Sequence, residues 1–237
     1  MRQRIRKGIL VFSTLFFPFT FYFLSPYVIV ISASRGILNG SGMVFGLLFL
    51  FSLICSRLYC GWLCPGGGVQ DFVSCANSHS WNSKGKNLPK YIIWAVWFSF
   101  IIFLWIHNRP VKGDFLYFWE FDMHYIMVYG IVVSTIYLFA ILTGRRGMCH
   151  SFCWMAPFMI IGEKLADLLH IPRFRLTAKP DVCVACGKCS RNCPMSLNVA
   201  EMVQSGNMDS VECINCLECV DGCPKKAISF KICKKLQ

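Results

Sequence analysis

Residues 183–194 read Cys-Val-Ala-Cys-Gly-Lys-Cys-Ser-Arg-Asn-Cys-Pro, which is a C-x2-C-x2-C-x3-C-P motif. The same spacing recurs thirty positions later, at Cys213, Cys216, Cys219, Cys223 and Pro224. Three thiolates on one tight loop can bind three corners of an iron–sulfur cubane, while the fourth, ahead of proline, turns towards a second cluster. The doubled motif therefore predicts two [4Fe–4S] clusters.

This crossed ligand pattern divides the cysteines into two sets of four. We expect the first cluster to be bound by Cys183, Cys186, Cys189 and Cys223, and the second by Cys213, Cys216, Cys219 and Cys193. A structural zinc site is the alternative, but zinc sites use two ligand pairs separated by a longer stretch rather than triplets.

Residues 180–232 resemble the bacterial two-cluster ferredoxins. The resemblance implies a small α+β ferredoxin-like domain, which we assign to residues 180–237. We expect a short helix with Val199 and Met202 on one face, and a strand with Ala227, Ile228 and Phe230. Cys55, Cys75 and Cys233 belong to no motif and are predicted to be plain thiols.

The chain ahead of this domain is strongly apolar. Over the whole sequence 55% of the residues are hydrophobic and only 15% are charged, a balance typical of membrane proteins. A transmembrane helix needs roughly 20 apolar residues. Three uncharged segments reach that length, at 9–31, 36–56 and 125–144, and a fourth, at 91–106, is slightly shorter. We therefore predict an α-helical membrane protein, with a four-helix transmembrane domain over 1–155 and a bend in the first helix at Pro18 and Pro26.

Two alternatives concern individual segments. The segment 91–106 is short for a span, so a core helix of a soluble protein is the other interpretation. The first apolar run is too long for the h-region of a signal peptide, about 7–15 residues, so we expect it to be retained.

The formal net charge of +12 is concentrated in the predicted membrane part, since residues 1–180 hold 17 basic and 6 acidic side chains. One predicted side collects 14 Lys and Arg, whereas the other has only Arg35, Arg109 and Lys112. The positive-inside rule then predicts a multi-pass protein of the inner (cytoplasmic) membrane with both termini in the cytoplasm. This topology accounts for the basic charge better than nucleic-acid binding does.

A second pair of cysteine motifs lies where predicted spans end on the cytoplasmic side. Both read R-x-x-C-x3-C, with Arg57 ahead of Cys60 and Cys64, and Arg146 ahead of Cys149 and Cys153. The motifs stand 89 residues apart and each follows two spans, which predicts a 2+2 pseudo-repeat. If the halves pack together, the four thiols can bind a third [4Fe–4S] cluster, with the arginines offsetting their charge. Buried free thiols are the alternative.

Residues 156–179 join the two predicted domains. Apolar positions there alternate with Glu163, Lys164 and Asp167, which predicts an amphipathic helix along the cytoplasmic interface, followed by a linker.

The four predicted spans, the two C-x3-C motifs and the terminal ferredoxin motifs together resemble the NapH-type membrane proteins, which are related to the NosR-type and CcoG-type proteins. The resemblance implies an electron-transfer subunit of a quinol dehydrogenase in a respiratory complex. Its partners would be membrane lipid, quinone or menaquinone, and a redox partner or catalytic subunit. The chain departs from the family pattern at Pro157, which stands four residues after Cys153 rather than next to it.

Two other functions fit the same motifs. A CcoG-like iron–sulfur maturation or assembly factor would use its clusters to reduce metals or thiols. A redox sensor is the other possibility. A relay would co-purify with a catalytic subunit, whereas a maturation factor would be absent from the finished complex.

The catalytic residues of quinol oxidation are not evident from the sequence. Proximity to the proposed third cluster favours a quinone near Tyr59, Trp62, His150 or Trp154. The other candidate region is the outward loop, with His107, Asp114, Glu120, Asp122 and His124, where an aromatic belt with solvated charges is the simpler interpretation. Haem ligation by His107 and His124 is a further alternative.

Overall fold

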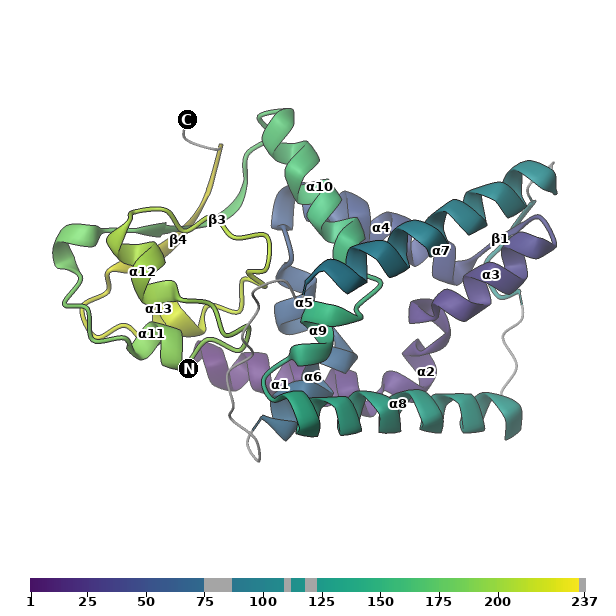
Figure 1. Cartoon of the computed structure of the whole chain (residues 1–237), viewed down its shortest axis with the longest axis horizontal. Coiled ribbons are helices and arrows are strands. Elements are labelled where there is room, and N and C mark those ends of the chain that lie inside the picture. Colours follow the sequence, from purple (N-terminus) through teal and green to yellow (C-terminus); the bar gives the residue numbers. More distant parts are fainter. Residues whose placement is uncertain (75–86, 109–111, 118–122, 235–237) are drawn as a thin grey trace.

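The computed structural model describes the chain except for residues 75–86, 109–111, 118–122 and 235–237. An elongated helical part carries a smaller mixed part at one end, on the left in Figure 1. The smaller part contains the doubled cysteine motif, and the N-terminus of the chain lies beside it.

The apolar segment 9–31 is not one continuous helix, so that expectation needs correction. It is divided among α1 (Arg2–Leu15), α2 (Phe17–Thr20), the 3-10 turn η1 (Tyr22–Leu24) and α3 (Pro26–Ser34). Pro18 and Pro26 each stand in the first turn of a new helix, where a missing N–H costs nothing. Ser25 caps α3, because its hydroxyl accepts a hydrogen bond from the Val28 amide at 3.5 Å. The predicted bend is present, and the chain breaks at it.

The second apolar segment begins with strand β1 (Ile37–Asn39) and only then forms α4 (Gly40–Cys55). The Asn39 side chain caps α4 by accepting a hydrogen bond from the Gly42 amide at 3.1 Å. At about 1.5 Å per residue, this 16-residue helix is roughly 24 Å long, shorter than a typical hydrocarbon core. β1 pairs in parallel with β2 (Lys112–Asp114).

Two helices are long and apolar enough to cross a membrane. They are α7 (Leu88–His107) and α8 (Met123–Thr143), with 20 and 21 residues. Only 11% of each apolar window is buried inside the protein, so neither is the core helix of a soluble domain. The helices lie at opposite edges of the helical part (Figure 1). The described residues thus support a membrane protein with two candidate spans.

A short helix and a longer one follow each of α4 and α8. The first pair is α5 (Leu58–Trp62) and α6 (Pro65–Val73), and the second is α9 (Gly147–Ser151) and α10 (Ala156–Leu168). The halves pack reciprocally, since α10 lies against α4 and α6 lies against α8. Such reciprocal packing is expected of a duplicated unit.

Helix α10 occupies the first half of the segment 156–179, where an amphipathic helix is expected. Its buried side chains include Met159, Ile160 and Glu163, and the face that carries them packs against α4 and α7. Ion pairs then join it to the next strand, because Arg173 Nη1 lies 2.8 Å from Glu163 Oε1 and Arg173 Nε lies 2.7 Å from Asp167 Oδ1.

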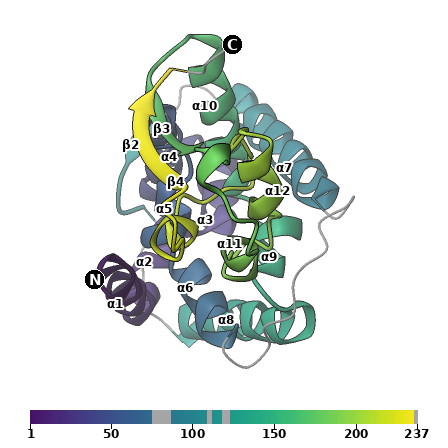
Figure 2. The same cartoon turned by 90° about the vertical axis from the view of Figure 1, so that its left-hand side faces the viewer.

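The smaller part is an α+β unit. Its elements are β3 (Arg173–Ala178), the 3-10 turn η2 (Pro180–Val182), α11 (Lys188–Arg191), α12 (Val199–Gln204), α13 (Glu218–Asp221) and β4 (Ile228–Cys233). β3 and β4 lie side by side (Figure 2). They pair in antiparallel register, with Ala178 opposite Ile228. The expected helix is present, with Val199 buried, and so is the expected strand, with Ile228 buried and Phe230 exposed. Ala227, expected in the strand, lies just ahead of it. The sheet begins at Arg173, ahead of the boundary expected at 180.

Candidate iron–sulfur centres

The two ferredoxin motifs repeat in backbone conformation as well as in sequence. Ala185, Gly187 and Ser196 have positive φ angles of 53°, 68° and 52°. The residues thirty positions later match them, namely Asn215 at 51°, Leu217 at 63° and Lys226 at 51°. Non-glycine residues rarely adopt this left-handed conformation, so three matched positions indicate that each cysteine loop needs one particular path.

Each loop shares a cavity with the fourth cysteine of the other motif. One cavity is lined by Cys183, Cys186 and Cys189 together with Cys223. A second cavity is lined by Cys213, Cys216 and Cys219 together with Cys193. These are the two sets that the crossed ligand pattern requires.

The thiols of the second cavity are poorly suited to ionise alone. Burial raises the pKa of Cys213 to about 12, and burial together with the charge of Cys193 raises the pKa of Cys216 to about 12. Bound iron would supply the positive charge that such thiolates lack, and its binding would release protons. The donor set therefore fits an iron–sulfur cluster.

Single-metal sites are not seen in the described part of the chain, where no three His, Cys, Asp or Glu side chains could hold one metal ion. A zinc site made of four cysteines needs its sulfurs to converge on one ion. In a cubane each thiolate binds a different iron, so wider spacing is expected.

The membrane-side cysteines come from corresponding positions of the two halves. Cys60 lies on α5 and Cys64 at the start of α6, while Cys149 lies on α9 and Cys153 just beyond its end. Burial raises the pKa of the Cys64 thiol well above its usual range, and the charges of the other three thiols raise it further. Burial, together with the charges of Cys149 and Cys60, raises the pKa of Cys153 to about 12. The four thiols are therefore close enough to repel one another when ionised.

Two buried arginines flank these thiols. Arg57 and Arg146, at 1% and 0% exposure, stand just before α5 and α9. Arg57 donates to the Val211 carbonyl oxygen at 2.8 Å and to Glu212 Oε2 at 3.1 Å. Burial disfavours its cation, yet the charges of Cys60 and Glu212 raise the pKa of Arg57 above its ordinary value.

Arg146 binds both carboxylate oxygens of Asp71, at 2.7 and 2.8 Å, and the Cys60 carbonyl oxygen at 2.8 Å. It thus ties the second motif directly to the first. Although burial opposes ionisation of Asp71, Arg146 and Arg6 hold the pKa of that carboxyl below its usual range.

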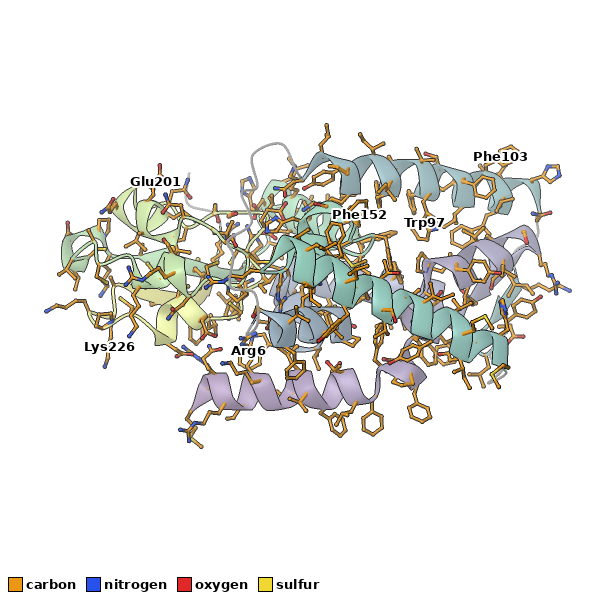
Figure 3. The ribbon with its side chains drawn as sticks, turned by 60° about the horizontal axis from the view of Figure 1, so that its bottom comes forward. Arg6, Trp97, Phe103, Phe152, Glu201 and Lys226 are labelled. Carbon is orange, nitrogen blue, oxygen red and sulfur yellow. The ribbon has the colours of Figure 1, made fainter. Side chains whose placement is uncertain are left out.

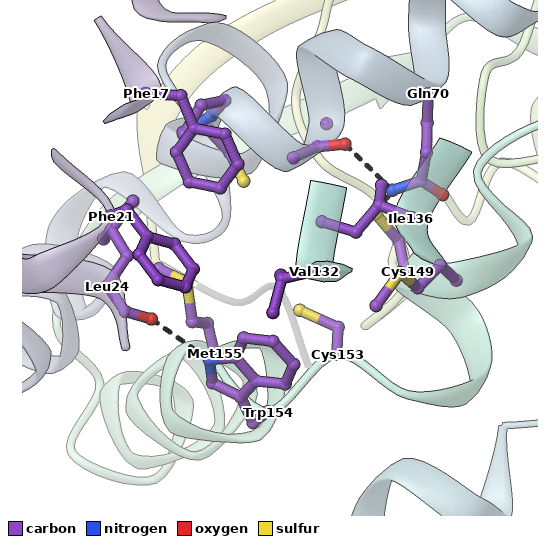
Figure 4. Close-up of a pocket in the computed structure, with 15 residues that line it drawn as sticks. Phe17, Phe21, Leu24, Gln70, Val132, Ile136, Cys149, Cys153, Trp154 and Met155 are labelled. Carbon is purple, nitrogen blue, oxygen red and sulfur yellow. Dashed lines mark hydrogen bonds between the residues drawn. The ribbon is translucent and has the colours of Figure 1, made fainter. Parts of the chain in front are cut away.

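An apolar cavity of about 70 Å³ adjoins the membrane-side cysteines (Figure 4). Its lining includes Cys64, Cys149 and Cys153, and its apolar wall is formed by Phe17, Phe21, Leu24, Val132, Ile136 and Trp154. The Trp154 indole is fixed at the rim, because its N–H donates to the Leu24 carbonyl oxygen at 3.4 Å.

Of the four residues expected near a quinone, the structure brings only Trp154 to this cavity. Trp62 donates to the Asn215 carbonyl oxygen at 3.1 Å, and Tyr59 packs between the two hydrophobic cores. The His150 ring nitrogens lie 2.9 Å from Asn87 Oδ1 and 3.1 Å from the Met195 carbonyl oxygen. These three residues line the junction with the ferredoxin part.

The outward loop is only partly described. His107 stacks on Phe103 at the end of α7, His124 lies in the first turn of α8, and Asp114 ends β2. Glu120 and Asp122, like Arg109 and Cys75 elsewhere, lie outside the described residues.

Three polar side chains at the site were not evident from the sequence. Gln70 donates a hydrogen bond to Cys149 Sγ at 3.2 Å, Asp71 binds Arg146, and Glu212 binds Arg57. Each of them lies close to a cysteine motif in the sequence, and this nearness is the signal that could have found them. Gln70 and Asp71 stand six and seven residues after Cys64, and Glu212 immediately precedes Cys213.

Two family profiles match the chain. One, described as a 4Fe-4S dicluster domain, matches residues 175–224 and covers all eight ferredoxin cysteines. The other, described as a 4Fe-4S binding domain, matches residues 40–79 and covers Cys60 and Cys64. The chain thus carries [4Fe–4S] domains. No solved structure matches it.

Relatives extend over most of the chain at low identity. An uncharacterized protein of Methanocaldococcus jannaschii is 27% identical, over 96% of this chain and 95% of its own length. The putative electron transport protein YccM of Escherichia coli is 23% identical, over 78% of this chain and 54% of its own. The ferredoxin-type protein NapH of Haemophilus influenzae is 24% identical, over 78% and 65%. The chain is thus similar, at low identity, to ferredoxin-type proteins named NapH and to an electron transport protein. The two 4Fe-4S profiles and these relatives support an iron–sulfur electron-transfer role with a redox partner protein.

Proposed function

We propose that the chain is a membrane-anchored subunit that relays electrons between the quinone pool and a redox partner. When bound, [4Fe–4S] clusters supply one-electron transfer. One observation carries the proposal, namely the direct contact between the two cysteine regions. A Cβ added at Gly61, one residue after Cys60, would overlap the Ile214 carbonyl oxygen and lie 3.3 Å from Cys216 Cα.

The proposed ligand sets follow the cavities. Cys183, Cys186, Cys189 and Cys223 would bind one ferredoxin cluster, and Cys193, Cys213, Cys216 and Cys219 the other. Cys60, Cys64, Cys149 and Cys153 would bind a third at the membrane surface, which is supported by the mutual effect of their charges. Arg57 and Arg146 would balance part of that charge.

The apolar cavity beside Cys64, Cys149 and Cys153 is the proposed quinone site. Ligand sites are concave and mostly apolar with a few placed polar groups, and this one has Gln70 in its wall. Because its volume of about 70 Å³ is smaller than a usual ligand site, side chains of the wall would have to move apart to admit a quinone ring. Side chains of α2 and α8 form its apolar side, which suits an isoprenoid tail arriving from lipid. Of the four residues expected near the quinone, the proposed site therefore includes Trp154. It does not include Tyr59, Trp62 or His150.

A four-span topology with cytoplasmic termini remains part of the proposal. α7 and α8 are the two long candidate spans, and α4 and the broken segment of α1 to α3 would complete the bundle. The distribution of Lys and Arg supports a cytoplasmic ferredoxin part.

Iron and sulfide quantification with an EPR redox titration of the purified full chain tests this function. Three clusters require about twelve irons, whereas about eight would exclude the membrane cluster. Cys149→Ser is expected to lower the iron content to about eight and to leave both ferredoxin signals. Cys55→Ser, which removes a thiol that belongs to none of the motifs, is the matched control. A quinol that reduces the wild type but not Cys149→Ser would support the quinone link, and equal reduction of both would contradict it.

A further inference from the structure

A cavity with several charged side chains in its wall, separate from the cysteine sites, lies between the helical part and the ferredoxin part. Its volume is about 390 Å³, within the range of small-molecule sites. Four cationic side chains from three segments line it, namely Arg6 and Lys7 of α1, Arg145 after α8, and Arg191 of α11. Figure 3 shows Arg6 on α1 where that helix meets the ferredoxin part.

The carboxylates in the wall are already neutralised. Asp71 and Glu218 lie 3.1 and 3.2 Å from the Arg6 guanidinium, and Asp71 also binds Arg146. Arg6 is only 2% exposed, so this pairing is internal to the protein. The wall therefore has an excess of positive charge facing the cavity.

The remaining cations are available to a ligand. Within the described ranges, no hydrogen bond or ion pair engages the side chains of Lys7 and Arg191, and both residues are exposed. Arg145 uses one guanidinium N–H for the Arg191 carbonyl oxygen, which holds it against the ferredoxin part. Lysine and arginine converging in this way suit a phosphate group, since arginine offers paired donors and lysine a compact charge.

The surface of α1 changes from charged at Lys7 to apolar further along the helix. Val11 and Leu15 follow at i+4 and i+8, on the same face, and are 38% and 70% exposed. Arg145 likewise stands just beyond the end of α8, whose Leu142 is 73% exposed. A ligand with a phosphate head and a hydrocarbon tail matches this order of surfaces, whereas free phosphate matches only the head.

We infer that this cavity binds the head group of an anionic phospholipid at the cytoplasmic end of α1 and α8. The lipid phosphate lies among Lys7, Arg145 and Arg191, and its acyl chains run along the Val11 and Leu15 face. The bound lipid thereby fills the seam between the membrane helices and the ferredoxin part. The inference rests on the proposed membrane orientation and is independent of the number of clusters.

Native mass spectrometry of the cluster-loaded full chain in uncharged detergent tests the inference. Phosphatidylglycerol, phosphatidylcholine and inorganic phosphate are titrated separately at equal phosphate concentration. One phosphatidylglycerol is expected to bind in preference to phosphatidylcholine. Lys7→Gln and Arg191→Gln are each expected to weaken its affinity about fivefold, and the double variant about 25-fold. Lys231→Gln, which removes a charge from exposed β4, is the matched control and is expected to bind as the wild type does.

Three results would overturn the inference. They are equal affinity of wild type and double variant for phosphatidylglycerol, equal binding of phosphatidylcholine, and displacement of the lipid by inorganic phosphate at the same concentration. The iron content of each variant is measured in parallel, because the proposed electron transfer requires it. Loss of lipid with full iron content is thereby distinguished from loss of the clusters.

Discussion

Gln70 is a polar side chain with a direct hydrogen bond to a membrane-side thiol. It is 3% exposed, and its amide donates to the Gly66 carbonyl oxygen at 3.0 Å and to Cys149 Sγ at 3.2 Å. An N–H bond to a ligating sulfur withdraws negative charge and stabilises the reduced cluster. Gln70→Leu is therefore expected to lower the midpoint potential of the proposed membrane cluster.

The size of this shift follows from the energy of the lost bond. A differential stabilisation of about 1 kcal/mol corresponds to roughly 40 mV for a one-electron couple. An EPR redox titration measures it, and the two ferredoxin signals are the internal control because Gln70 lines neither of their cavities. An unchanged potential of the third signal would remove the proposed role of Gln70.

Asp71 holds two arginines from different parts of the chain. Its loss leaves the buried Arg146 guanidinium without its carboxylate, so Asp71→Asn is expected to destabilise the protein by about 3 kcal/mol at pH 7. Because the folded-state pKa of Asp71 is lowered, the stabilisation is complete above its unfolded value of 3.8 and is lost as pH falls below it.

Unfolding temperatures at a fixed scan rate check both parts of this prediction. The difference between wild type and Asp71→Asn should be constant from pH 8 to about pH 5 and should shrink only in stronger acid. A difference that already shrinks between pH 8 and pH 6 would contradict the assignment to Asp71.

At the residue scale, the sequence predicts the cysteines better than their neighbours. Thiolate spacing reflects the shape of the cluster, so the local sequence is enough to identify the eight ferredoxin cysteines. The partners of Arg146 cannot be found in this way, because Asp71 is 75 residues distant and meets it only when α6 packs against α8. Charged residues in apolar surroundings indicate that a partner exists without showing which one it is.

At the scale of elements, the contact between α4 and α10 depends on a glycine. A Cβ at Gly162 would overlap Ser52 Oγ and lie 2.9 Å from the Phe49 carbonyl oxygen, so the two helices touch through their backbones. Gly162→Ala is expected to force α10 away from α4 and to cost about 1–3 kcal/mol of stability.

Gly46→Ala is the matched control for this variant. Gly46 lies on α4, and a Cβ added there would have no neighbouring atom within 4 Å, so alanine should stabilise the helix by up to about 1 kcal/mol. Thermal unfolding of both variants in the same detergent is the measurement. Equal effects of the two substitutions would show that close packing at Gly162 is unimportant.

The elements also show where sequence patterns reach their limit. Apolar content over 9–31 identifies the segment, and Pro18 and Pro26 mark the breaks, yet the division into four pieces depends on tertiary packing. Tyr22 and Phe21 are buried at 1% and 7% exposure, so the broken segment packs against the helices around it. For 91–106 and 125–144 the pattern was sufficient, because α7 and α8 are regular helices that face outward.

At the scale of the whole molecule, the two parts are joined by charges along one seam. Arg2 binds Asp221, Gln3 donates to the Cys216 carbonyl oxygen at 3.1 Å, and Arg6 reaches Glu218. The N-terminal helix thus holds the loop of the second ferredoxin motif against the membrane-side motif. This arrangement could not be predicted from the sequence, because both ends of the chain contribute to it.

The backbones of the two parts approach closely at Gly61. Because its α-carbon faces the Ile214 carbonyl oxygen and the Cys216 backbone, Gly61→Ala must displace the ferredoxin part or distort α5. We expect the variant to keep all its iron, to lose about 1–3 kcal/mol of stability, and to transfer electrons more slowly between the proposed membrane cluster and the cluster at Cys216.

Stopped-flow reduction by a quinol, with the clusters followed separately by freeze-quench EPR, measures that step. Gly8→Ala, at a position of α1 with open space around it, is the control. If Gly61→Ala leaves the rate of ferredoxin reduction unchanged while Cys149→Ser abolishes it, electrons do not cross at this contact, and the proposed order of centres is wrong.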